Sequence, residues 1–294
     1  MPTNQLTNQL DGKIALITGG ARGLGREMAL AFAEAGAAGV AITAAPGSDE
    51  TSAIIEQELN DTLVEIGAAG CMGLALQGDV SVAEDCQRVV RETVEAFGGL
   101  HILVNNAGKA GRYAHGGKGS MPIYEADPEG FRAVIDTNVL GPYLMAWAAT
   151  RHLTEAGWGR IINISKRTQS MHRKAITPYG PSKAAMEAAT IAWAEAMFGT
   201  GITVNSLSPG GAINTKFGSG EITGNGPEPT VIRNMAVWLA SPASDGVTGC
   251  RYCADKWDEA LPPDDAAERC RERAIFPVPG YETPLDKAWA EPEG

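Results

Sequence analysis

The sequence predicts an α/β protein with one doubly wound parallel sheet and helices on both faces of that sheet. Short apolar runs alternate with longer segments of helical spacing along most of the 294 residues, as in successive βαβ units. A glycine-rich turn follows the first apolar run directly. The length suffices for one large domain of this class.

The first half of the chain sets the alternation. Apolar runs of strand length predict strands at residues 13–18, 39–45, 72–80 and 101–104. Good helix formers at helical spacing, or polar helix-prone stretches, predict helices at residues 24–38, 49–66 and 82–97. Helical crossovers of this kind return the chain to the same end of the sheet, so we expect parallel pairing.

The second half continues the pattern and then changes in composition. Further helices are predicted at residues 128–155, 181–197 and 229–240, and further strands at residues 160–165, 202–207 and 249–254. Prolines punctuate the chain after Asp255, with one helical stretch at 264–273. We interpret residues 1–254 as one domain and 255–294 as an extension that packs on it or on a neighbouring subunit.

The composition excludes several classes of function. Lys plus Arg is 24 and Asp plus Glu is 35, so the formal net charge is −11. We therefore expect no binding to nucleic acid or to anionic membranes. No apolar run reaches the roughly 18 residues of a spanning helix, and residues 1–12 lack the features of a secretory signal. These observations indicate a cytoplasmic protein.

Five scattered cysteines are typical of free thiols in a reducing compartment. Cys250 and Cys253 form a C-x-x-C pair, but a structural zinc site normally needs two more ligands, and only Cys270 lies downstream. We expect no metal site, and we interpret the pair as strand residues.

The glycine-rich turn is a candidate phosphate site. Residues 18–25 read Thr-Gly-Gly-Ala-Arg-Gly-Leu-Gly, between a predicted strand and a predicted helix. Glycines allow the backbone to approach a pyrophosphate closely, and the N–H groups of the following helix point at it. This context predicts dinucleotide binding on a Rossmann-type sheet.

Four ordered motifs over residues 11–249 resemble the short-chain dehydrogenase/reductase family. The turn matches its T-G-x-x-x-G-x-G loop, 105–108 read Asn-Asn-Ala-Gly, 179–183 match Y-x-x-x-K, and 209–210 read Pro-Gly. The resemblance implies an NAD(P)-dependent oxidoreductase that interconverts a secondary alcohol and a ketone. The implied cofactor-binding residues are Gly19, Arg22, Gly23, Leu24, Gly25, Asp79, Val80, Asn106, Ala107, Gly108, Tyr179, Lys183, Pro209 and Gly210, with Thr215 a further candidate.

The preference between the two nicotinamide cofactors depends on the end of the second predicted strand. A carboxylate there would bind the ribose 2′-hydroxyl and repel a 2′-phosphate. The sequence has Thr43-Ala-Ala-Pro46 and no acid before Asp49, and Arg22 could pair with a 2′-phosphate. This favours NADP(H) over NAD(H).

Tyr179 and Lys183 are candidate catalytic residues. They lie four residues apart and therefore share one face of a predicted helix. A nearby ammonium stabilises a phenolate and lowers the pKa of a tyrosine, which suits proton transfer to or from a substrate oxygen. The resemblance implies that Lys183 also binds the nicotinamide ribose and that Asn138 relays protons.

One position departs from the family pattern. The family places a serine about 13 residues before the tyrosine to bind the substrate carbonyl, and this chain has Lys166 there. Three interpretations follow. Lys166 could polarise the carbonyl, Ser165 or Thr168 could serve instead, or the site could be impaired. An added ammonium would also favour an anionic substrate or a nucleotide phosphate.

Two further features of the sequence concern the substrate region and the assembly. Residues 109–119 are glycine-rich and basic, with Arg112, Tyr113, His115 and Lys118, and suit either a substrate grip or a solvated loop; His172 is interpreted as a pocket or surface residue. The resemblance implies a dimer or tetramer of identical chains through the two long helices. The alternatives to redox turnover are a nucleotide-binding sensor or partner, or a lyase or epimerase on the same scaffold.

Overall fold

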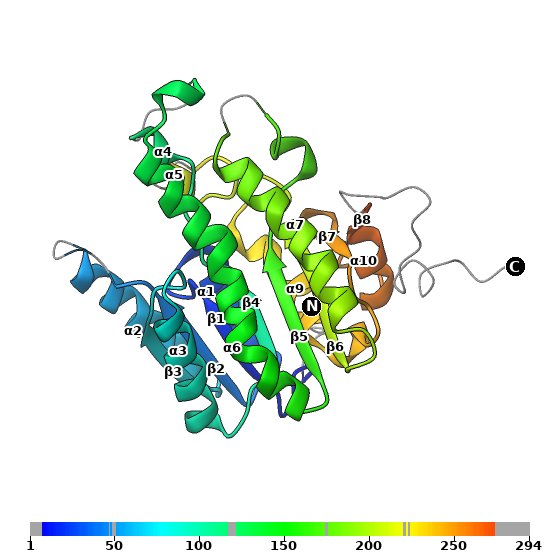
Figure 1. The fold of residues 1–294 in the computed structure, drawn as a ribbon. Helices are drawn as coiled ribbons and strands as arrows, with labels where there is room; N and C mark the ends of the chain where they lie inside the picture. Colours follow the sequence, from blue (N-terminus) through cyan, green and yellow to red (C-terminus); the bar gives the residue numbers. More distant parts are fainter. Residues whose placement is uncertain are drawn as a thin grey trace, which may run out of the picture.

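The computed structural model describes residues 8–46, 48, 51–116, 122–173, 176–219, 222 and 224–273. In this part of the chain one eight-stranded sheet has the order β3-β2-β1-β4-β5-β6-β7-β8 (Figure 1). The strands are β1 (Ile14–Thr18), β2 (Gly39–Ala44), β3 (Met72–Gln77), β4 (Ile102–Asn105), β5 (Gly159–Ile164), β6 (Ile202–Ser208), β7 (Arg251–Cys253) and β8 (Arg271–Glu272). The strand order reverses at the β1–β4 pair, which is where doubly wound sheets bind their ligands.

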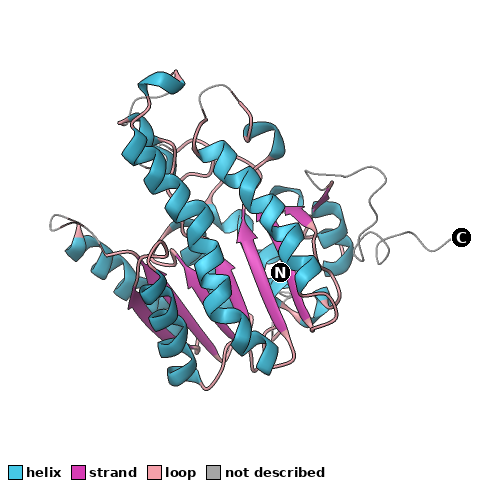
Figure 2. Cartoon of the chain, in the orientation of Figure 1, coloured by secondary structure: helices cyan, strands magenta, loops and turns pink. Residues whose placement is uncertain are grey.

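Helices cover both faces of this sheet (Figure 2). The longer helices are α1 (Gly23–Glu34), α2 (Ser52–Ala68), α3 (Ala83–Phe97), α5 (Pro128–Ile135), α6 (Gly141–Glu155), α7 (Tyr179–Ala196), α9 (Arg233–Ala240) and α10 (Pro263–Cys270). The short ones are α4 (Arg112–His115), α8 (Lys216–Ser219), η1 (Ile123–Glu125), η2 (Asp136–Leu140), η3 (Thr168–Ser170), η4 (Pro229–Ile232), η5 (Pro242–Ser244) and η6 (Ala254–Lys256).

Two apolar cores hold these layers together. One lies between the sheet and α1 and α9, and it contains Met28 and Phe32 with no exposed surface. The other lies between the opposite face and α3, α6 and α7, and it contains Val89 and Met145. Each fully buried side chain of this size contributes ~1.5–3 kcal/mol of hydrophobic stabilisation. The predicted fold class is therefore confirmed.

Several boundaries differ from the sequence prediction. The expected helix at 128–155 is α5, a π-turn at η2 and α6, with Pro142 at the second position of α6. The helix expected from residue 181 begins at Tyr179, because a proline is tolerated in a first helical turn. The expected strand 72–80 ends at Gln77.

A short strand that the sequence did not predict, β8, forms one edge of the sheet. β8 pairs antiparallel with β7, and α10 before it buries Ala266, Ala267 and Cys270 against the core.

All five cysteines are buried free thiols, and burial raises the pKa of Cys253 to about 12. The described residues contain no cluster of His, Cys, Asp or Glu that could hold a metal ion. None of their helices meets the length and hydropathy needed to span a membrane.

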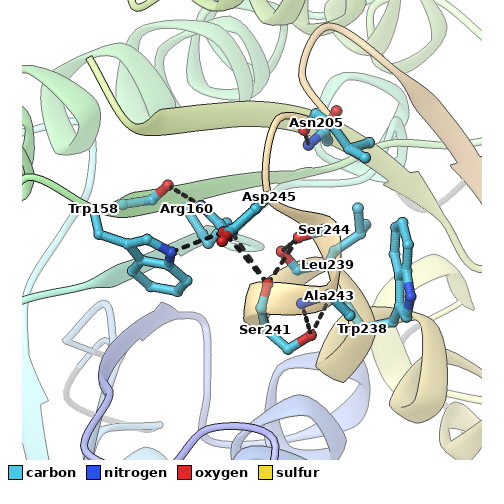
Figure 3. A network of polar contacts seen from close by, with 11 residues as sticks. Trp158, Arg160, Asn205, Trp238, Leu239, Ser241, Ala243, Ser244 and Asp245 are labelled. Carbon is cyan, nitrogen blue, oxygen red and sulfur yellow. Dashed lines mark hydrogen bonds and ion pairs between the residues drawn. The ribbon is translucent and has the colours of Figure 1, made fainter. Parts of the chain in front are cut away.

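At the amino end of β5 a buried arginine is fully engaged (Figure 3). Arg160 is 1% exposed and forms an ion pair with Asp245, and its Nη2 also donates to the Ser241 carbonyl at 3.2 Å. The Trp158 ring lies 3.9 Å from the guanidinium carbon, and its Nε1 donates to Asp245 at 2.9 Å. This cluster, the Arg160 cluster, joins β5 to the segment after α9.

Candidate active site

The glycine loop lies at the carboxyl end of β1. Gly19 and Gly23 have φ values of +66° and +59°, in the region that favours glycine, and a Cβ at Gly25 would collide with the Gly19 carbonyl. Asn106, after β4, fixes the loop, because its Nδ2 donates to the carbonyls of Thr18 and Gly19 at 2.9 and 3.0 Å. A side chain at Gly19, Gly23 or Gly25 would strain this loop or collide with it, so the loop fits the close approach of a pyrophosphate.

The N-terminus of α1 also fits an anion. Its N-cap residue, Arg22, forms no side-chain capping hydrogen bond, so no side chain of the cap occupies the first-turn N–H groups. These groups and the helix dipole attract negative charge. The Arg22 side chain, 54% exposed, pairs with Glu58 of α2 at 3.0 Å. Leu24 packs on the core beside the loop.

The remaining predicted cofactor residues surround the same end of the sheet. Asp79 lies two residues beyond β3 and accepts hydrogen bonds from the Ser81 amide and hydroxyl at 2.9 and 2.7 Å, next to buried Val80. The Ala107 amide donates to Thr18 Oγ1 at 3.0 Å.

Three further candidates connect the loop to the other strand ends. A Cβ at Gly108 would lie 3.2 Å from Asn138 Oδ1. Gly210, after Pro209, has a φ of +103° and packs against Asp255. A Cβ at Gly23 would lie 3.4 Å from Thr215. The loop, β4, β6 and η2 thus meet at one edge.

Tyr179 opens α7 at this edge. Its ring lies 5.6 Å from the ring of Phe217 in α8, and the Nζ of Lys166 lies 4.7 Å from its centroid. Gly111 also approaches it, since a Cβ there would lie 3.8 Å from Tyr179 Cβ. Burial raises the pKa of the Tyr179 phenol above its usual value. The phenol is therefore protonated at neutral pH.

Lys183 lies one turn further along α7 and is 5% exposed. Its Nζ donates to the Ile164 carbonyl at 2.7 Å. Burial lowers the pKa of Lys183 to about 8; the Glu187 carboxylate opposes this shift and the Lys166 ammonium adds to it.

Asn138 sits in the π-turn with no exposed surface. Its Oδ1 accepts from the Lys109 amide at 2.7 Å, and its Nδ2 donates to the Lys109 carbonyl at 2.9 Å and to Ser182 Oγ at 3.0 Å. Ser182 Oγ donates in turn to the Tyr179 carbonyl at 2.8 Å. π-Turns often mark functional positions, and here the turn joins Asn138 to the first turn of α7.

Lys166 and Ser165 follow β5 and differ in surroundings. The Lys166 ammonium lies over the Tyr179 ring, and burial followed by the charge of Arg173 lowers its pKa to about 8. Ser165 is 3% exposed, and its hydroxyl is buried without a hydrogen-bond partner in the described residues. Thr168 lies in η3. Of the three, Lys166 contacts Tyr179.

The basic segment after Gly108 is more ordered than a solvated loop where it is described. Residues 112–115 form α4, and buried His115 bonds through Nε2 to the Thr177 carbonyl at 2.7 Å, two residues before Tyr179. The cationic groups of Lys109 and Arg112 both lie over the ring of Tyr113. His172 is exposed. Lys118 and Asp49 lie outside the described residues.

Sequence reasoning missed two contributors to the site, Phe217 and Arg251, and it named His115 without predicting its contact. Phe217 reaches Tyr179, and His115 reaches the loop before Tyr179, from segments that are remote in sequence. Arg251 of β7 donates through Nη2 to the Lys166 carbonyl at 2.5 Å. No local motif marks such contacts, because they exist only once the sheet has assembled.

The fold and this edge define a dinucleotide-binding α/β protein with a tyrosine–lysine pair. The family model described as short chain dehydrogenase matches residues 13–222. The short chain dehydrogenase/reductase astE of Aspergillus oryzae is 32% identical over 272 residues, which cover 87% of this chain and 98% of that protein.

Two further relatives agree. The NADPH-dependent aldehyde reductase 1, chloroplastic, of Arabidopsis thaliana is 34% identical over 207 residues, covering 70% of this chain and 67% of that protein. The crystal structure of a dehydrogenase/reductase from Sinorhizobium meliloti 1021 superposes with a TM-score of 0.71 at 33% identity, covering 84% of this chain and 95% of that one. The chain belongs to the short-chain dehydrogenase/reductase family and is an NAD(P)-dependent oxidoreductase of alcohol and carbonyl groups.

Proposed function

We propose that Tyr179 is the general acid/base of this oxidoreductase and that the reaction takes place at the carboxyl end of the sheet. One observation carries the proposal: Tyr179, Lys183 and Asn138 meet beside the glycine loop, with Asn138 bonded to Ser182 between the other two. Tyrosine and lysine one helical turn apart present their polar ends to the same space.

The chain's own residues handle the proton. The nicotinamide, when bound, supplies or accepts the hydride. In reduction, the Tyr179 phenol donates its proton to the substrate oxygen, and burial keeps that phenol in the protonated form. The Lys183 ammonium, which uses one donor on the Ile164 carbonyl, keeps two donors for the nicotinamide ribose and stabilises the resulting phenolate. Asn138 and the Lys109 backbone form the start of a proton path.

Lys166 takes the place of the carbonyl-polarising serine in this proposal. Its ammonium adjoins the Tyr179 ring, and a positive charge there stabilises the oxyanion that develops in the transition state. The buried hydroxyl of Ser165 and the η3 position of Thr168 make them weaker candidates for this role.

The test is NADPH or NADH absorbance turnover with a panel of ketones, aldehydes and secondary alcohols. We expect Tyr179→Phe to lower kcat about a thousandfold while NADPH still binds, because only the proton donor is lost. Undiminished turnover in that variant would contradict the proposal. Turnover absent in the wild type and gained in Lys166→Ser would instead favour a nucleotide-binding protein whose site the lysine has silenced.

We further propose that the chain prefers NADP(H) to NAD(H). Arg22 stands at the phosphate end of α1, the described residues 43–46 carry no acid, and one relative is named NADPH-dependent. Bidentate pairing of a guanidinium with a 2′-phosphate would replace the Arg22–Glu58 pair.

The cofactor preference has a direct test. In fluorescence titrations, Arg22→Ala should weaken NADPH binding about tenfold and leave the Kd for NADH unchanged, because only NADPH carries the 2′-phosphate. Equal weakening of both would place Arg22 at the shared pyrophosphate instead. The substrate of the family's enzymes is a small molecule, and the homo-oligomer expected from the sequence stays a prediction.

A further inference from the structure

A buried arginine on β7 joins α7, which carries Tyr179 and Lys183, to β8 in the C-terminal segment, the described residues after Asp255. Arg251 has 2% of its side chain exposed, and its guanidinium is bonded on three sides. It forms an ion pair with Glu187 through Nη1, donates through Nε to Glu272 at 2.9 Å, and donates through Nη2 to the Lys166 carbonyl at 2.5 Å. One side chain thus holds α7, β8 and the end of β5.

The acceptor on α7 lies one turn after Lys183. Glu187 has 4% of its side chain exposed, and its second oxygen accepts from Ser206 Oγ of β6 at 2.8 Å. Its negative charge favours the ammonium form of Lys183, against both burial and the neighbouring Lys166 ammonium. Glu187 therefore lies between the candidate catalytic lysine and the buried arginine.

From Lys183 to Glu272 the charges alternate in sign, and Lys166 stands outside this series as a like charge beside Lys183. Glu187 faces Lys183 from its own helix, and Lys166 faces it from the end of β5. Behind Glu187 lie Arg251 and then Glu272, which also binds Lys256 of η6 at 2.9 Å. Alternation lets each buried charge find an opposite neighbour, which offsets the cost of desolvation.

We infer that Glu187 and Arg251 are positioning residues of the active site: Glu187 holds Lys183 as an ammonium, and Arg251 fixes the backbone of Lys166. Glu272 completes the cluster from the C-terminal segment, so that segment takes part in building the site. The inference rests on the proposed role of Lys183 in binding the nicotinamide ribose.

The main test uses the full chain and NADPH as the probe. NADPH affinity is measured by fluorescence from pH 6 to 10, and the wild type should bind more weakly as Lys183 loses its proton. Glu187→Gln keeps the size and one acceptor oxygen but removes the charge. Lys183 then loses its proton more readily. The fall in NADPH affinity at high pH, here called the alkaline limb, should therefore begin about one pH unit lower.

Two matched backgrounds isolate the effect. Lys166 titrates in the same range, so the shift is also measured between Lys166→Met and the Lys166→Met/Glu187→Gln double variant. Asp245→Asn removes the acid that pairs with the other buried arginine, at the far end of the sheet, and should leave the limb in place.

Arg251 is tested by hydrogen exchange, which does not depend on activity. Arg251→Met leaves the Lys166 carbonyl without its donor, so amides in residues 165–171 should exchange about tenfold faster while those of β1 keep their rates. Equal acceleration in both segments would indicate global destabilisation and would overturn the role assigned to Arg251.

An unmoved alkaline limb in Glu187→Gln, with NADPH still bound, overturns the role of Glu187. If that variant does not fold, Glu272→Gln takes its place, because Glu272 has 21% of its side chain exposed; a smaller shift in the same direction is expected, and no shift overturns the inference. A wild type that binds NADPH with no alkaline limb, or does not bind it, would instead contradict the proposed function.

Discussion

The two ends of β5 hold cations in opposite ways: Arg160 is buried and Lys166 is half-buried. At the amino end, the Arg160 guanidinium meets the Asp245 carboxylate, the carbonyls of Ser241 and Gly159 and the ring of Trp158. At the carboxyl end, Lys166 has no acidic partner within the described residues, and the adjacent Ser165 hydroxyl has no hydrogen-bond partner there.

This contrast separates structural from functional polarity. Buried polar groups are nearly always paired, and an unpaired one costs stability. The Arg160 cluster satisfies its donors internally and so has none to offer a ligand. The end of β5 beside Tyr179 keeps donors available, and a substrate oxygen or phosphate can use them. We therefore expect the Arg160 cluster to govern stability, and the incompletely paired end of β5 to govern activity.

Arg160→Met gives the largest expected effect on stability. The variant loses the hydrogen bonds of a buried cation, and Asp245 stays hydrated because 60% of its side chain is exposed. We expect the free energy of unfolding to fall by about 2 kcal/mol, measured by urea denaturation. The Kd for NADPH should not change. A higher Kd would contradict this contrast between the two ends of β5, because the amino end would then affect cofactor binding.

Lys166→Met should change stability in the other direction. Partial burial lowers the folded-state pKa of Lys166 from 10.5 to about 8, so at pH 7 the folded protein keeps the ammonium charged at a desolvation cost. Removing it should stabilise the fold by about 1 kcal/mol at pH 7, while kcat/KM falls at least about tenfold.

The pH dependence of that difference has a definite sign. Between pH 8 and about 10.5 the unfolded wild type holds the Lys166 proton that the native state has lost, so wild-type stability rises with pH over this window. The advantage of Lys166→Met should therefore shrink from pH 7 to pH 10 in urea denaturation. An advantage that stays constant would mean that the gain comes from packing of the methionine rather than from the charge.

The sequence predicts those parts of the site that depend on local spacing. The glycine loop, the Tyr179–Lys183 pair and the position of Lys166 follow from short motifs whose geometry is set by one turn or one helix. The approach of Phe217 to Tyr179, the His115 bond to the Thr177 carbonyl and the Arg251 bonds depend on contacts between remote segments. No periodicity records them.

Two features of the fold could not be predicted from the sequence for the same reason. The π-turn at Asn138 interrupts a segment that has ordinary helical spacing, and its bonds to Lys109 and Ser182 come from elsewhere in the chain. β8 is two residues long, and its pairing with β7 is reinforced by Glu272 and Arg251. Both elements are stabilised by tertiary contacts more than by local propensity.

Ser165→Ala gives the smallest expected change and decides between the two residues that end β5. The hydroxyl is buried without a partner among the described residues. Its removal relieves a desolvation cost but leaves a small void, so the free energy of unfolding should change by less than about 0.5 kcal/mol. Because Lys166 rather than Ser165 contacts the Tyr179 ring, kcat/KM should change less than about threefold. A tenfold loss of kcat/KM with an unchanged free energy of unfolding would mean that the Ser165 hydroxyl binds the substrate carbonyl. Lys166 would then act only on the charge of that carbonyl oxygen.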